Sequence, residues 1–158
     1  MTVKIFIHTT AKPPKKHITG FAYVLEARPH GEPVTLTNQG TLEDYTKNDA
    51  ELATVLKALE HLRKPSELEI YTTPFMATAI NKWLPEWEKT GWKTRAGKEV
   101  GEGYKKLAEA LKVHSYTATD AASEYTQWLA RTAAEVEAEA LMLKTAPEKA
   151  KTEEPKSQ

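Results

Sequence analysis

The sequence predicts one α/β domain with a mixed five-stranded sheet flanked by helices. Its 158 residues suit a single domain that buries most of its apolar surface. Segments with an apolar period of two and segments with a helical period follow one another in a fixed order: three strands, helix, strand, helices, strand, helix. This order is typical of helices that cover a mixed sheet.

Three strands are predicted at the beginning of the chain. Alternating apolar residues over 3–7 indicate a strand that ends at His8. Strands near 18–27 and 34–41 flank a turn rich in proline and glycine. We expect these two strands to pair as an antiparallel hairpin beside the first strand.

A helix and a strand follow over residues 48–73. The helix carries an apolar stripe at helical spacing, formed by Leu52, Val55, Leu56, Leu59 and Leu62. After Pro65 the period drops to two, which predicts a strand over 68–73. Glu51 shares the apolar stripe and points towards the sheet. One explanation is a capping box, in which the Glu51 side chain reaches back to Asn48 at the helix start.

The remaining elements complete the domain. A helix from about residue 74 has a stripe that includes two tryptophans, a short helix spans 104–111, and a strand spans 113–118. A long helix is expected over 121–144. Residues 145–158 are dominated by Lys, Glu, Pro, Ser and Ala, and we expect this tail to be disordered.

The composition excludes several classes of protein. Lys+Arg and Asp+Glu both number 22, so the chain lacks the basic excess common among nucleic-acid-binding domains. It has no cysteine and therefore no disulfide or zinc-thiolate site. No apolar run reaches the ~20 residues of a membrane span, and there is no signal-peptide pattern. We expect a soluble cytoplasmic monomer.

Two stretches resemble type 1 ribonuclease H. Residues 48–60 contain Asn-x-x-Glu-Leu followed by Ala-Leu-Glu, and residues 80–94 contain three spaced tryptophans that end in Gly-Trp-Lys-Thr. The second stretch is similar to the family's helix and protruding substrate-binding loop. The resemblance covers about 3–134. It implies the ribonuclease H fold and metal-dependent cleavage of RNA–DNA hybrids.

The resemblance also implies a cluster of four carboxylates that binds two divalent ions. Transferred position by position, these carboxylates fall on His8, Glu51, Thr73 and Gln127, so Glu51 alone is retained. The loop before the last helix is shortened to 116–121 and has lost its histidine. One carboxylate beside hydroxyl, amide and imidazole groups is a poor Mg²⁺ site. We expect the nuclease activity to be lost, and Mg²⁺ or Mn²⁺ to be needed only if it survives.

A relocated metal site is the alternative. His8 and Glu51 could ligate a softer ion such as Mn²⁺ or Zn²⁺, with Asp49 or Asp120 nearby. Against this, Asp49 points to a different helix face, Asp120 suits the N-cap of the last helix, and His8 suits a hydrogen-bonded structural role. Glu51 is then a retained cap or a relic.

A surface for nucleic acid is predicted on two loops and one helix start. Its candidates are Lys12, Lys15, Lys16, His17, Asn48, Trp83, Lys89, Trp92, Lys93 and Arg95. Asn48 matches a family asparagine that reads the RNA backbone, where an amide can meet a 2′-hydroxyl. Trp83 and Trp87 share a helical stripe with Ile80, which favours core positions for both. Binding of a hybrid or duplex should be weak and salt-sensitive.

The sequence therefore predicts a ribonuclease H-like pseudo-enzyme with residual nucleic-acid binding. Two other functions stay open. One is an active hybrid endoribonuclease with a relocated metal site. The other is a scaffold module, in which the alanine- and glutamate-rich helix end over 133–141 docks a protein partner.

Overall fold

The predicted mixed sheet is confirmed. The computed structural model describes residues 1–145, so the predicted tail beyond Thr145 lies outside the described residues. The strands lie in the order β3-β2-β1-β4-β5. β1 is antiparallel to β2 and parallel to β4. The strand bounds are β1 (Thr2–Thr9), β2 (Ile18–Ala27), β3 (Val34–Glu43), β4 (Glu67–Tyr71) and β5 (Ser115–Thr119).

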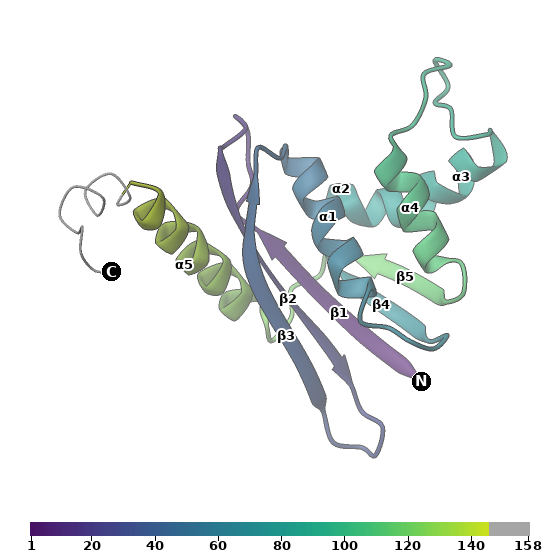
Figure 1. Ribbon diagram of the computed structural model, residues 1–158. Helices are drawn as coiled ribbons and strands as arrows, with labels where there is room; N and C mark the ends of the chain where they lie inside the picture. The colour runs from purple at the N-terminus through teal and green to yellow at the C-terminus, as the bar shows by residue number, and fades with distance from the viewer. Residues whose placement is uncertain (146–158) are drawn as a thin grey trace.

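Helices cover both faces of the sheet (Figure 1). Alternation along β1 sends Ile5 and Ile7 into the larger core, which includes the apolar stripe of the first helix. Phe6 points to the opposite face and packs with Leu129 and Ala133 of the last helix. The helices are α1 (Lys47–Leu59), α2 (Pro74–Thr78), the π-helical turn η1 (Ala79–Trp83), α3 (Leu84–Lys89), α4 (Glu102–Leu111) and α5 (Thr126–Thr145).

Helix α1 begins differently from the capping box that the sequence suggested. Its N-cap is Thr46, whose hydroxyl accepts a hydrogen bond from the Asp49 amide at 3.2 Å. The capping-box explanation of Asn48 and Glu51 is therefore wrong, because another residue already supplies the cap. The placement of Glu51 on the buried stripe is confirmed, since only 3% of the residue is exposed.

The helix after β4 changes its winding before Pro85. Pro85 has no amide hydrogen, and the turn before it is π-helical, with the Leu84 amide bonded to the Ala79 carbonyl. Asn81 in this turn forms two hydrogen bonds with the backbone of Ala118, at 2.8 and 2.9 Å. These bonds fasten the helix to edge strand β5. Trp83 and Trp87 are half-buried against the core, as predicted.

Helix α5 begins at Thr126, five residues later than expected. Asp120 therefore lies in the loop before the helix, and its predicted N-cap role is wrong. The helix packs closely on β2, because a Cβ on Gly20 would lie 1.9 Å from the carbonyl oxygen of Ala133. Neither α5 nor any other helix of the described residues is long and apolar enough to cross a membrane.

Candidate functional site

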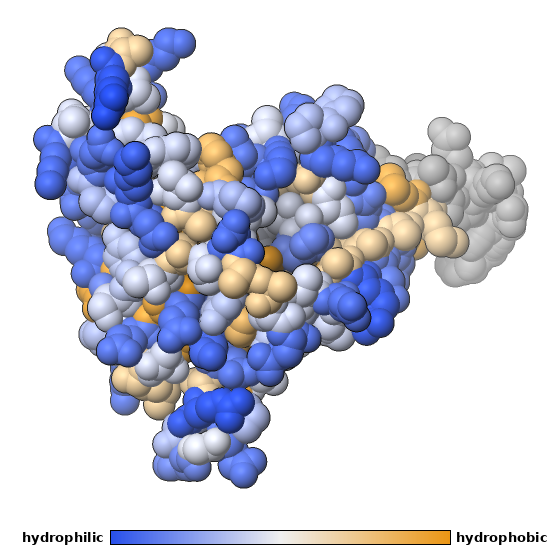
Figure 2. Space-filling view, turned by 180° about the vertical axis from the view of Figure 1, so that it is seen from behind, coloured by the Kyte–Doolittle hydropathy of each residue, from blue (hydrophilic) through white to orange (hydrophobic). Residues whose placement is uncertain are grey.

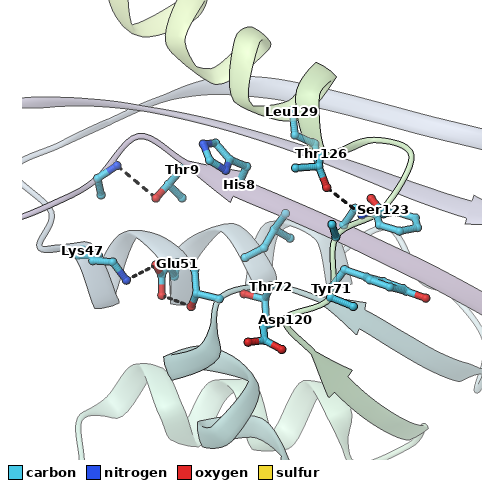
Figure 3. A pocket seen from close by; sticks show the side chains of 16 residues that line it. His8, Thr9, Lys47, Glu51, Tyr71, Thr72, Asp120, Ser123, Thr126 and Leu129 are labelled. Atoms are coloured by element: carbon cyan, nitrogen blue, oxygen red, sulfur yellow. Dashed lines mark hydrogen bonds and ion pairs between the residues drawn. The ribbon is translucent and has the colours of Figure 1, made fainter.

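A pocket of about 390 Å³ opens where β1 and β4 end. The two strands are parallel, so their carboxyl ends meet at one edge of the sheet. Helix α1 and the loop before α5 complete the walls (Figure 3). The polar lining residues are His8, Thr9, Lys47, Glu51, Thr72, Thr73, Asp120, Ser123 and Thr126.

Three of the four positions that match the family carboxylates share this pocket. His8, Glu51 and Thr73 come from β1, α1 and the N-cap of α2. Gln127 does not line the pocket and is exposed on the first turn of α5. The neighbouring Thr126 takes that place and accepts a hydrogen bond from the Ser123 amide at 2.8 Å.

Both oxygens of Glu51 are engaged by side chains. Lys47 Nζ lies 2.8 Å from Oε2 (Figure 3). Thr73 Oγ1 donates a hydrogen bond to Oε1 at 2.8 Å. Thr73 also accepts the Met76 amide at the start of α2. The glutamate is thus fixed between the first turns of two helices, with an ammonium group as its cation.

His8 lies at the same edge as Glu51. Burial lowers the pKa of His8 below its ordinary value, and the negative charge of Glu51 opposes that shift. The imidazole is therefore neutral near pH 7. At the same edge, Thr72 Oγ1 is buried and makes no hydrogen bond among the described residues.

The donor set does not fit a pair of divalent ions. Two cations a few ångströms apart need several carboxylates, whereas this pocket offers Glu51, already paired, and the exposed Asp120. Among the described residues, the one group of three or more His, Asp and Glu side chains close enough to share an ion is His17, Glu43 and Asp44. That group lies outside the pocket.

Some of the side chains predicted to contact nucleic acid are exposed, and others are held in ion pairs within the protein. Lys12, Lys15 and Asn48 are exposed near the pocket side of the sheet, on the loop after β1 and the first turn of α1. Lys16 is held in a 2.8 Å ion pair with Glu137 of α5. His17 forms a 3.0 Å pair with Asp44.

A second group lies on the protruding loop after α3. Trp92 is half-buried with a positive φ of 65° and packs against the main core, while Lys93 beside it is exposed. Lys93 and Arg95 border a second pocket with Trp83 and Trp87. The loop projects from the body of the molecule, and its surface is mostly hydrophilic (Figure 2).

Sequence reasoning missed two members of the site, Lys47 and Thr126. Lys47 stands four residues before Glu51, a spacing that places both side chains on one helix face. That spacing was a usable signal. No sequence signal pointed to Thr126. Whether Thr126 or Gln127 faces the pocket depends on the residue at which α5 begins after the shortened loop.

Known proteins resemble this chain in sequence and in structure. The sequence model of the RNase H family matches residues 8–120, more than half of the chain. Ribonuclease H of Clostridium botulinum (strain Hall) is 42% identical over 76 residues, covering 46% of this chain and 51% of that protein. Ribonuclease H of Francisella tularensis subsp. novicida is 40% identical over 62 residues, covering 39% and 41%. The chain thus spans about half the length of these relatives.

Solved structures share the fold at low sequence identity. LC9-RNase H1, a type 1 RNase H with the type 2 active-site motif, superposes with a TM-score of 0.65 at 16% identity, covering 87% of this chain and 72% of that one. The RNase H domain of prototype foamy virus gives 0.59 at 22%, covering 87% and 92%. These structures and the sheet order show the fold. The family model over residues 8–120 shows that the chain belongs to the RNase H family.

Proposed function

We propose that this protein binds RNA–DNA hybrid or duplex nucleic acid and does not cleave it efficiently. The observation that carries the proposal is the state of Glu51. It is the one family carboxylate kept in sequence, and it is bonded to Lys47 and Thr73 inside the pocket. Catalytic enhancements of ~10⁶-fold or more depend on several groups acting together, and most of them are replaced here. The chain is a pseudo-enzyme in this proposal.

The exposed polar residues support binding. Lys12, Lys15 and Asn48 lie on the loop and helix start beside the pocket, and Lys93 lies on the protruding loop. Ammonium groups contact phosphates, and an amide reads a 2′-hydroxyl. Half-buried Trp92 fixes the backbone next to Lys93 and offers an aromatic surface for backbone contact.

The structural neighbours support the class of ligand. LC11-RNase H1, with a TM-score of 0.60 to this chain, was solved in complex with an RNA/DNA hybrid. The foamy viral protease-reverse transcriptase was solved with double-stranded DNA and with an RNA/DNA hybrid. For this chain the affinity should be modest, because its net charge is zero and Lys16 is already paired.

Fluorescence anisotropy of a labelled hybrid, in EDTA and over a range of salt, tests the proposal. We expect saturable binding that weakens steeply with salt. The double variant Asn48→Ala/Lys93→Ala should bind roughly tenfold more weakly. The salt slope, which is the slope of the logarithm of the binding constant against the logarithm of the salt concentration, should fall in magnitude by about one. Lys64→Ala, a lysine on the exposed loop before β4, is the matched control. No saturation at low salt, or equal weakening by the control, would refute the binding role.

A protein partner is the second candidate function. Leu141, Met142 and Leu143 near the end of α5 are 43%, 71% and 65% exposed. Hydrophobic colour follows this helix towards the grey residues in Figure 2. Exposed apolar groups of this size favour a docking site. A pull-down with and without nuclease treatment separates the two functions, because partners held through nucleic acid are lost after digestion. Light scattering of the purified protein tests the expected monomer.

A further inference from the structure

The Lys47–Glu51 pair is not explained by the local energetics of α1. Lys47 is the first residue of the helix, where the positive end of the helix dipole disfavours a cation. Lysine placed four residues before glutamate is also the weaker order for a pair on a helix surface. A pair formed against both preferences needs a cause outside the helix.

That cause is the burial of Glu51 at the sheet edge. Its side chain is 4% exposed, whereas the Lys47 side chain is 38% exposed and reaches in from the rim of the pocket. A buried carboxylate without a cation is strongly destabilising. In the metal-dependent members of the family that charge is offset by bound ions, and this pocket lacks the other carboxylates that would hold them.

We propose that Lys47 is the resident cation of this pocket and stands in for the divalent metal at Glu51. Its ammonium group neutralises Oε2, while the Thr73 hydroxyl bonds to Oε1 and ties α1 to the start of α2. The charge of Glu51 is thereby neutralised, and both of its oxygens are bonded, without a metal ion. A divalent ion would have to displace Lys47 from Glu51 and would gain only Asp120 as a further carboxylate in the pocket.

Two consequences follow, and neither depends on nucleic-acid binding. Mg²⁺ and Mn²⁺ should not stabilise the protein through Glu51, because the described residues of this pocket form no vacant carboxylate cluster. Removal of the Lys47 charge alone should be more harmful than removal of both charges, because the single change leaves Glu51 buried and unpaired.

Thermal unfolding of four proteins tests the assignment: wild type, Lys47→Met, Glu51→Gln and the double variant. Lys47→Met should lower the Tm by roughly 5 °C. The double variant should recover part of that loss. The matched control is the exposed pair Lys112 and Glu109, whose charged atoms lie 4.0 Å apart. Lys112→Met should shift the Tm by no more than about 1 °C. Lys47→Arg keeps the cation and should stay near wild type, which separates loss of charge from loss of folding.

Three results would overturn the assignment. One is a Lys47→Met loss no larger than that of Lys112→Met. Another is a double variant less stable than Lys47→Met. The third is a wild-type Tm that rises with Mn²⁺ and loses this rise in Glu51→Gln. All measurements are made without nucleic acid, so a failure here is distinct from a failure of hybrid binding.

Discussion

Replacing Gly20 by alanine tests how closely α5 must pack on the sheet. The new Cβ would lie 1.9 Å from the Ala133 carbonyl oxygen, whereas real Cβ atoms stay at least 3.0 Å from their neighbours. The helix or strand must therefore withdraw by at least 1.1 Å. Overpacking of a tight contact by one methyl group costs about 1–3 kcal/mol of stability. Because the atom in the way belongs to the backbone and cannot rotate aside, we expect a cost of about 3 kcal/mol for Gly20→Ala. In a domain of this size that is a Tm loss of roughly 6–12 °C.

Urea unfolding followed by circular dichroism measures this cost. Gly101→Ala is the control, because its added Cβ meets no atom within 4 Å and its φ of −59° suits alanine. The control should stay within about 0.5 kcal/mol of wild type. Equal losses for the two variants would refute the close packing of α5.

Three further predictions concern single side chains. The carboxylate of Glu26 accepts a hydrogen bond from Tyr125 and raises the pKa of that phenol to about 12. The folded state therefore holds the phenol proton to a higher pH than the unfolded state. The free energy of unfolding that this proton contributes is fully present below about pH 10 and is lost as the pH rises towards 12. In urea unfolding, Tyr125→Phe should remove this alkaline loss of stability. Asn81→Leu removes both hydrogen bonds to Ala118 and should cost about 1–3 kcal/mol in the same assay. Lys93→Ala should lower the salt slope of hybrid binding by a little under one while leaving the Tm unchanged; an unchanged slope would remove Lys93 from the interface.

The sequence was sufficient for the fold because the pattern of apolar residues is local. The alternation over β1 and the stripe of α1 both survive in the structure, and they place Glu51 at the sheet edge as expected. The error at the start of α1 has a simple origin. Thr46 stands two residues before the expected cap, so the helix starts earlier. Its hydroxyl accepts from the Asp49 amide, whereas the capping box would have served the amides of Asn48 and Glu51.

The site was harder to predict because its contacts join distant parts of the chain. Thr73 bonds to Glu51 across 22 residues, and Lys16 pairs with Glu137 across 121. No spacing in the sequence signals such pairs. Gln127 lies outside the pocket wall for a different reason. A one-residue change in helix phase turns a side chain by about 100°, enough to exchange Gln127 for Thr126 at the pocket wall.

Cleavage of an end-labelled RNA–DNA hybrid at high protein concentration tests the central claim most directly. The assay is run with Mg²⁺ and, separately, with Mn²⁺, beside Glu51→Gln. We predict an intact hybrid with both metals and both proteins, under conditions where anisotropy shows the wild type bound. Cleavage by the wild type that disappears in Glu51→Gln would contradict this. It would show that His8 or Asp120 completes a working metal site with Glu51.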